Sequence, residues 1–413
     1  MKSRPSERVI YRNIPSVKLT LVTIESAKQL PVLKSKPYLL LDILRGLTAL
    51  WVVSYHSCLP YLTGSDQVTQ QKKIYWVSLH GQLGVVIFFV ISGYCITAAA
   101  YSLILKQGKI TQFCSARVHR IYPPYFFTCL MAIVMDFLIN WLGVHHLIPM
   151  RNHVSYHVSG PAFWVANFSM TQFELHQDFL VNVFWSLCYE IFFYFMVALL
   201  LLITMKMLRL RSIETKSRVF ALGIGALTLT SLLWLIFNPQ TCLFPFNLWY
   251  QFGLGGLLFF SIDKAFRQVH SAKWVPVLLV SSMVASIALA TIHSDDGAYG
   301  HPSTSAQAIT SVLLVLGLAF LYKFDHKIST YKSAKPLFFL GSFSYSLYLV
   351  HRLILPIANI IGRRMGIDHA AYPLNMLIQI SLGVLAGWIF YFLCERHFIS
   401  SNRQKYIQAE QRS

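Results

Sequence analysis

Charged side chains are scarce in this chain. Asp, Glu, Lys and Arg make up 12% of its 413 residues, whereas a soluble globular domain carries about 25%. Hydrophobic residues make up 55%. This balance excludes an ordinary water-soluble domain and predicts an integral membrane protein.

Acidic residues are scarcer than basic ones, and the cysteines follow no pattern. The chain has 16 Asp and Glu against 35 Lys and Arg, and its seven cysteines form no CxxC pair or zinc-type spacing. A nucleic-acid-binding protein gathers its basic residues on a folded, water-facing surface, which this chain barely has. We therefore expect no nucleic acid and no bound metal, and we expect the cysteines to be small buried hydrophobic residues.

Histidines gather in one predicted loop, at about residues 144–178. They are His145, His146, His153, His157 and His176. A metal site and a solvated loop both explain such a cluster. No tight i, i+4 acid-histidine motif accompanies them, which favours the solvated loop.

Long apolar runs recur from one end of the chain to the other. Each has about 18 to 25 residues, enough to cross a hydrocarbon core of about 30 Å. They predict an all-α, polytopic bundle of about ten membrane helices. Residues 161–174 are too short to span comfortably and are expected to form a re-entrant or interfacial helix. The predicted spans are 38–60, 79–104, 121–143, 179–205, 219–238, 243–262, 275–292, 304–322, 337–358 and 372–393.

The basic residues predict the orientation of these spans. With a cytoplasmic N-terminus, 28 of the 35 Lys and Arg fall on the inner side, as the positive-inside rule expects for ten helices with both termini inside. The first 37 residues are polar and basic and lack the apolar core of a signal peptide. We expect residues 1–37 and 398–413 to be cytoplasmic tails. The basic residues of the outer loops are Lys72, Lys73, Arg151, Arg363 and Arg364.

Arg45 and His56 are eleven positions apart in the first span. Eleven residues are about three helical turns, which places both side chains on one face, roughly 16 Å apart. Ionisable groups inside a membrane are costly and usually mark a functional site. The structural alternative is a histidine hydrogen-bonded within a helix bundle. We predict a catalytic or substrate-handling role for His56.

Further ionisable residues are expected at a similar depth. Glu190 lies about 14 Å into the fourth span from the outside, and a carboxylate there needs a partner or a cavity. His351, in the ninth span with Tyr345, belongs with His56 to the outer half of the membrane. This grouping predicts a proton-handling pocket, although a structural histidine pair is the alternative.

Two other motifs have competing structural explanations. Ser92 and Gly93 interrupt a bulky run in the second span, either at a break that lines a cavity or where helices pack closely. Arg117 and Arg120 lie just before Pro123, which is expected to start the third span. These arginines share a helix face that can grip phosphate or anchor to anionic lipid headgroups.

Five such segments occur in the order of a known family. They are the first helix with Asp42, Arg45, Gly46 and His56; FFVISGY at residues 88–94; Arg117 and Arg120 to Pro123; WSLCYEIFFY at residues 185–194 with Trp185, Ser186 and Glu190; and SYSLYLVH at residues 344–351, followed by Glu395. In this series the chain resembles the acyltransferase-3 family of polytopic membrane O-acyltransferases, over about residues 38–397. It departs at His397, where the family usually has proline, and at Pro356, which follows His351 later than expected. Both departures concern helix ends.

The resemblance implies an acyl donor and a carbohydrate acceptor. The donor is typically acetyl-CoA from the cytoplasm, a co-substrate rather than a bound cofactor. The acceptor is typically a hydroxyl of a cell-envelope glycan, such as an O-antigen sugar, or of a lipid-linked precursor. A bacterial inner membrane, and so contact with membrane lipid, follows from the same resemblance.

The resemblance also suggests roles for individual residues. His56 would be the general base, with Arg45 and Glu190 as its catalytic companions; whether His56 instead carries the acyl group transiently stays open. Glu190 is expected to orient His56 or stabilise its imidazolium. The predicted donor-binding residues are Arg117, Arg120, Ser92, Gly93 and Tyr94. The predicted supporting residues are Asp42, which would orient Arg45, and Trp185, Ser186, Tyr345 and His351.

Transport is the competing class of function. Ten helices with intramembrane charges and a glycine break also describe a carrier, but carriers commonly have two related halves, and the two halves here do not match. A third hypothesis is a relay that moves the acyl group outward for a separate transferase. Because the chain ends about 20 residues after its last predicted helix, we expect it to acylate its acceptor alone.

Overall fold

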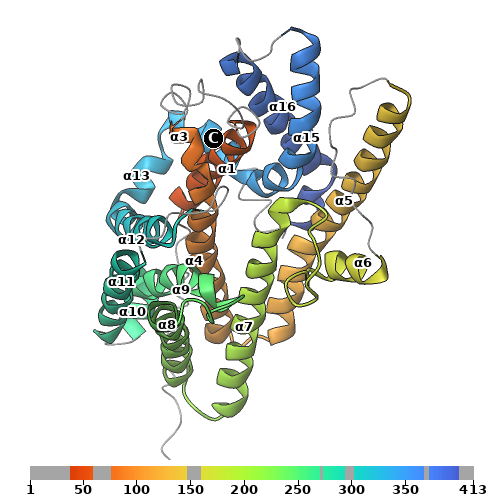
Figure 1. Ribbon diagram of the computed structural model, residues 1–413. Helices are drawn as coiled ribbons and strands as arrows, with labels where there is room; N and C mark the ends of the chain where they lie inside the picture. Colours follow the sequence, from red (N-terminus) through yellow and green to blue (C-terminus); the bar gives the residue numbers. More distant parts are fainter. Residues whose placement is uncertain are drawn as a thin grey trace, which may run out of the picture. The chain divides into compact units, whose positions relative to one another are not determined.

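A computed structural model describes residues 38–58, 76–146, 160–269, 273–293, 302–366 and 372–399, which all belong to one compact unit, residues 35–413. These residues form helices and no strand, as the sequence predicts (Figure 1). Apart from residues 398 and 399, the predicted tails lie outside the described residues. In chain order the elements are α1 (Leu40–Cys58), α3 (Trp76–Leu79), η2 (His80–Leu83), α4 (Gly84–Leu105), α5 (Ile110–Val144), α6 (Gly160–Ser169), η3 (Asn182–Phe184), α7 (Trp185–Met207), α8 (Ile213–Phe237), α9 (Phe246–Ile262), α10 (Lys264–Val269), α11 (Trp274–Ile292), α12 (Thr304–Leu321), η4 (Tyr322–Phe324), α13 (Asp325–Ser329), η5 (Lys332–Ala334), α14 (Lys335–Ser342), α15 (Ser344–Arg364), α16 (Tyr372–Leu393) and η7 (Glu395–Phe398).

Eight helical segments among the described residues are long and apolar enough to cross a membrane. They contain α4, α5, α7, α8, α11, α12, α15 and α16. The two other predicted spans are also helices, α1 with 19 residues and α9 with 17. The chain is therefore an all-α, multi-pass membrane protein, while the count of ten and the cytoplasmic termini stay predictions. Helix α6 has ten residues, about 15 Å, so it is too short to span.

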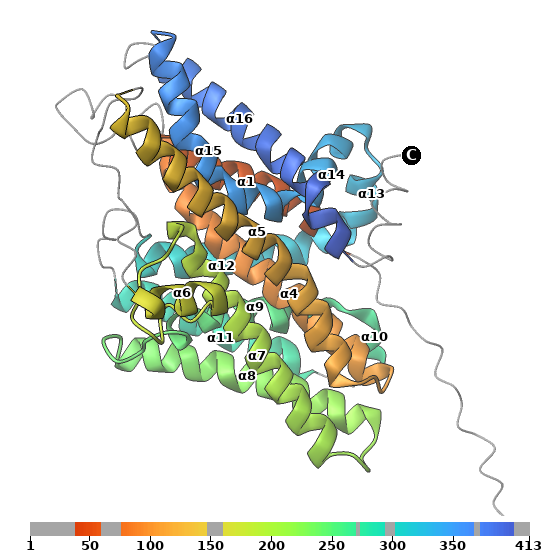
Figure 2. The same cartoon turned by 90° about the vertical axis from the view of Figure 1, so that its right-hand side faces the viewer.

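Helix α4 lies between two groups of helices (Figure 1, Figure 2). On one side α1 packs against α14, α15 and α16, and on the other α8, α9, α11 and α12 pack against one another. Helix α4 contacts α1, α7 and α9. This arrangement brings together the motif-bearing helices α1, α4, α7 and α15, which are far apart in the sequence.

Glycines allow α4 and α9 to approach each other closely. A Cβ on Gly93 would lie 1.9 Å from the carbonyl oxygen of Phe252, and a Cβ on Gly255 would lie 1.9 Å from that of Val90. Helix α4 is continuous through Ser92 and Gly93. Of the two explanations for Gly93, the helix break is therefore wrong, and close packing of small residues accounts for it.

The N-terminal end of α1 is held by elements from the C-terminal third of the chain. The backbone N–H groups of Leu39 and Leu40 donate to the two carboxylate oxygens of Asp325, at 3.1 and 2.8 Å. A Cβ on Gly341 of α14 would lie 2.0 Å from the carbonyl oxygen of Asp42. These contacts satisfy N–H groups that a helix start leaves unpaired, and they fix the position of the helix that carries Arg45 and His56.

The predicted start of the third span is wrong. Helix α5 begins at Ile110, so Arg117 and Arg120 lie within a helix and Pro123 lies in its interior. Membrane helices tolerate proline where neighbouring helices satisfy the backbone. Helix α15 contacts this part of α5 through the Tyr345 hydroxyl, which donates to the carbonyl of Ile121 at 3.1 Å.

The predicted ninth span is not one helix. The helix is interrupted at Phe343, which lies between α14 and α15. The Ser344 hydroxyl donates to the carbonyl of Gly341 at 2.9 Å, and the backbone N–H and hydroxyl of Ser346 donate to the Glu395 carboxylate at 3.1 and 2.6 Å. Such side-chain bonds compete with helical ones, and the carboxylate caps the new helix. The expectation of a single helix over residues 337–358 was therefore wrong.

Candidate functional site

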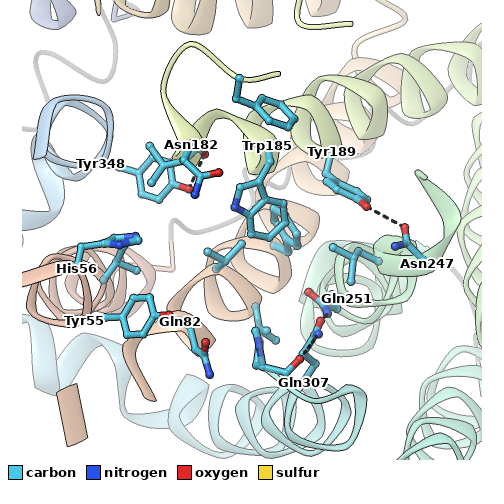
Figure 3. Close-up of a pocket in the computed structure, with 18 of the residues that line it drawn as sticks. Tyr55, His56, Gln82, Asn182, Trp185, Tyr189, Asn247, Gln251, Gln307 and Tyr348 are labelled. Atoms are coloured by element: carbon cyan, nitrogen blue, oxygen red, sulfur yellow. Dashed lines mark hydrogen bonds between the residues drawn. The ribbon is translucent and has the colours of Figure 1, made fainter. Parts of the chain in front are cut away.

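Of the two cavities that are lined by predicted site residues, the larger contains His56. This His56 cavity has a volume of about 460 Å³. Its lining comes from the C-terminal end of α1, from residues at the start of the α4, α7, α9 and α12 segments, from the chain just before α7, and from Tyr348 of α15 (Figure 3). Besides His56, its polar lining residues include Gln82, Asn182, Asn247, Gln251 and Gln307.

The smaller cavity contains Arg45. This Arg45 cavity has a volume of about 80 Å³ and is also lined by Ser92, Arg120, Glu190 and Tyr345. The two cavities have neighbouring linings, since Val85, Phe89 and Tyr348 line both. The helix face that carries Arg45 and His56 therefore runs from one cavity to the other.

His351 is the side chain that the structure brings to His56. The two rings have their centroids 5.2 Å apart. The Nδ1 of the fully buried His351 lies 2.7 Å from the carbonyl oxygen of Tyr348. Because a carbonyl only accepts, this contact assigns the proton of the neutral His351 ring to Nδ1 and leaves Nε2 as an acceptor. Among the described residues, neither Nε2 of His351 nor Nδ1 of His56 has a hydrogen-bond partner, and both are buried.

Glu190 belongs to the other cavity. Its Oε1 accepts from the Ser92 hydroxyl at 3.0 Å and from the Tyr194 hydroxyl. Glu190 lines the Arg45 cavity and does not line the His56 cavity. The expectation that Glu190 orients His56 does not match this arrangement, in which its hydrogen-bond partners are Ser92 and Tyr194.

Only one of the two predicted donor-binding arginines lines a cavity that contains a predicted site residue. Arg120 lines the Arg45 cavity, and Arg117 does not. The Arg117 guanidinium lies over the ring of Phe113, 5.4 Å from its centroid, and its Nε is buried without a partner among the described residues. Arg45 is paired with Asp42, Nη1 to Oδ1 at 3.0 Å, as their spacing of three residues predicts.

The other predicted site residues divide between the cavities and the core. Trp185 lines the His56 cavity, and Ser186 lines the Arg45 cavity, where its hydroxyl is 2.6 Å from that of Tyr348. Gly93 and Tyr94 line neither. Tyr94 packs its ring edge-on against Tyr38 and Phe259. These two predicted donor-binding residues therefore serve helix packing in this structure.

Sequence reasoning missed the amide groups of the His56 cavity. Asn247 and Gln251 lie in the predicted span 243–262, and Gln307 lies in the predicted span 304–322. Two amides near the start of an apolar span were an available signal. Amides carry no charge, so the cost of burying charge in a membrane does not single them out.

The cysteines and the histidines at positions 145, 146 and 176 lie among the described residues. All seven cysteines are free. Burial raises the pKa of the Cys242 thiol to about 11, which keeps it protonated and unreactive. Among the described residues no group of three or more His, Cys, Asp and Glu is arranged to hold a metal. His153 and His157 lie outside the described residues.

Comparisons with known proteins agree with the order of the motifs. The acyltransferase-3 family, described as an acyltransferase domain, matches residues 38–393. A relative from Rhizobium radiobacter, "Protein 2 in picA locus", is 32% identical over 165 residues, which are 37% of this chain and 77% of the relative. No solved structure gives a significant match. Since the family match covers most of the chain, this protein belongs to the acyltransferase-3 family and is a multi-pass membrane acyltransferase.

Proposed function

We propose that this acyltransferase moves an acyl group, typically acetyl from acetyl-CoA, to a hydroxyl of a cell-surface carbohydrate or lipid-linked glycan precursor in a bacterial inner membrane. The observation that carries the proposal is the pair of adjoining cavities. One contains two arginines, the other contains His56 among uncharged polar groups, and they share Val85, Phe89 and Tyr348. A donor in the first and an acceptor in the second would meet at this shared lining.

The Arg45 cavity suits the donor. Guanidinium groups bind phosphate with forked hydrogen bonds, and acetyl-CoA carries phosphates at the end remote from its thioester. In the predicted orientation Arg117 and Arg120 lie at the cytoplasmic face, where acetyl-CoA is found, and Arg45 lies within the first span. A cavity of about 80 Å³ cannot hold a whole CoA molecule. We therefore assign only the thioester arm to it, and the diphosphate to the segment of Arg117 and Arg120 on α5.

His56 supplies the base for the transfer. The acceptor oxygen attacks the thioester carbonyl carbon, so that a C–O bond forms and the C–S bond breaks with its electron pair on the CoA sulfur. His56 takes the hydroxyl proton and returns it to the CoA thiolate. If Nδ1–H of His56 donates to Nε2 of His351, Nε2 of His56 keeps its lone pair for this step.

Mass spectrometry of cell-envelope glycans tests the proposal. The samples come from cells with the wild-type gene, without it, with His56→Ala, and with His145→Ala as a control, because His145 is exposed at the end of α5. We expect the mass increment of one acyl group with the wild type and His145→Ala, and none in the other two samples. Equal acylation by His56→Ala, or no increment with wild-type protein present in the membrane, would contradict the proposal. An increment that requires a second protein would indicate a relay.

A further inference from the structure

We infer that the His56 cavity is a subsite for an electrically neutral, hydroxyl-rich sugar ring, held by Gln82, Gln251 and Trp185. This inference rests on the proposed function, because it takes the cavity to be the place of the acceptor. It goes further than the proposed function in two ways. It states that the acylated sugar is uncharged, and it names three residues that bind this sugar.

The described lining of the cavity has no Lys, Arg, Asp or Glu side chain, which argues against a sugar ring that carries a charge. Arg352, next to His351 on α15, does not line it. A carboxylate, phosphate or ammonium group moved from water into this site would have no ion-pair partner in the lining, and burying an unpaired charge is costly. A neutral sugar avoids this cost.

Two amide oxygens require hydrogen-bond donors from the ligand. Gln251 is 1% exposed, and its Nε2 donates to Oε1 of Gln307 at 2.9 Å. The Oε1 of Gln251 and the Oε1 of Gln82 are buried and have no partner among the described residues. Native proteins rarely leave such acceptors unpaired. Sugar hydroxyls would satisfy both, whereas an acyl chain or an ether would satisfy neither.

An aromatic surface lies between the amides and His56. Figure 3 shows His56 and Tyr348 at one end of the cavity and Asn247, Gln251 and Gln307 at the other, with Trp185 between them. Aromatic faces carry a partial negative charge, and the C–H face of a sugar ring carries a partial positive one, so the two stack. A ring packed on Trp185 would present one hydroxyl to His56 and others to the amides.

A further donor is available at the same end. The Tyr189 hydroxyl donates to Oδ1 of Asn247 at 3.0 Å, which orients that amide and leaves its nitrogen free to donate. The far end of the cavity therefore offers both acceptors and a donor. Hydroxyl groups, each of which both donates and accepts a hydrogen bond, match this mixture better than a group that only donates or only accepts.

The inference is tested by identifying the sugar that carries the acyl group and by replacing one amide side chain of the cavity. Tandem mass spectrometry of glycans from cells expressing the wild type would identify the acylated sugar, and we expect it to be neutral. Gln251→Leu should lower the acylated fraction at least about tenfold at equal protein level, because the hydroxyl of the correct sugar loses its acceptor. Gln112→Leu is the matched control, since Gln112 is exposed and lines neither the His56 cavity nor the Arg45 cavity.

Several results of this test would contradict the inference. An acyl group on a uronic acid, a phosphorylated sugar or an amino sugar with a free ammonium group would overturn the inference while leaving acyl transfer established. Unchanged acylation by Gln251→Leu would overturn it as well. If Gln251→Leu fails to reach the membrane, Gln82→Leu replaces it, with the same expected loss and the same contrary result. No acyl increment with the wild type would instead contradict the proposed function.

Discussion

The rings of His56 in α1 and His351 in α15 lie next to each other, with their centroids 5.2 Å apart, and of the two only His56 is among the described residues that line the His56 cavity. Each ring keeps one buried nitrogen without a partner among the described residues. Because Nδ1 of His351 is bonded to the Tyr348 carbonyl, its Nε2 can only accept while the ring is neutral. We predict that His351 is a positioning residue, whose Nε2 accepts from Nδ1–H of His56 during transfer and so selects the tautomer of His56.

Replacing His351 should lower kcat without weakening donor binding. His351→Leu removes the acceptor, so we expect kcat to fall about tenfold, the value of one lost hydrogen bond, with KM for acetyl-CoA unchanged. His351→Gln keeps an amide oxygen and should restore part of the rate. Steady-state kinetics of the purified variants in lipid vesicles measure both constants. Equal losses in the two variants would indicate a purely structural role.

The arginines of α5 should act on donor binding first. Arg117→Ala combined with Arg120→Ala removes two groups that can hold phosphate, and we expect KM for acetyl-CoA to rise about tenfold or more. Isothermal titration with CoA, which has no acyl group to transfer, would show the same loss in affinity. Arg209→Ala is the control, because Arg209 is exposed at the end of α7 and away from both cavities. An unchanged affinity for CoA would contradict the assignment.

Phe89 should keep water away from the thioester. Its side chain lines both cavities and stacks on Phe252, with ring centroids 4.4 Å apart. Phe89→Ala removes a side chain from the wall that the two cavities share, so we expect acetyl-CoA hydrolysis without acceptor to rise while transfer to glycan falls. The release of free CoA thiol measures hydrolysis. Phe195→Ala, at a 60% exposed position on α7, should leave both rates unchanged; a Phe89→Ala protein with the same ratio of hydrolysis to transfer would disprove a barrier role.

The sequence predicted the site best where the signal was local. Helical periodicity places Arg45 and His56 on one face, and the cost of burying charge points to both residues and to His351. Depth counting also grouped Glu190 with the histidines, which the structure does not. Depth along a helix says nothing about the direction in which a side chain points, and Glu190 points to Ser92 and Tyr194.

Other features depend on partners that are distant in the sequence. The break at Phe343 needs the Glu395 carboxylate, which caps α15 at Ser346 from 49 positions away. The role of Gly93 depends on the backbone of Phe252 in α9. Neither contact follows from periodicity or composition, because a continuous helix and an interrupted one can have the same sequence pattern. Only the packed neighbour distinguishes them.

The contact of α1 with α14 should be decisive for stability. Alanine at Gly341 would place a Cβ 2.0 Å from the Asp42 carbonyl oxygen, and backbone atoms of two packed helices cannot yield easily. Such overpacking costs about 1–3 kcal/mol or more. We therefore expect Gly341→Ala to unfold at a clearly lower temperature than the wild type, and to lose activity because α1 carries Arg45 and His56.

Gly317 offers the matched control for this prediction. A Cβ there would meet no atom within 4 Å, and alanine is favoured over glycine inside a helix by about 0.5–1 kcal/mol. Gly317→Ala should therefore unfold at the wild-type temperature or slightly above. A thiol-reactive fluorophore can follow both transitions in detergent, because all seven cysteines are free and five are buried. Equal unfolding temperatures for the two variants would mean that α1 and α14 can separate without cost, and the close approach would then not be what holds α1 in place.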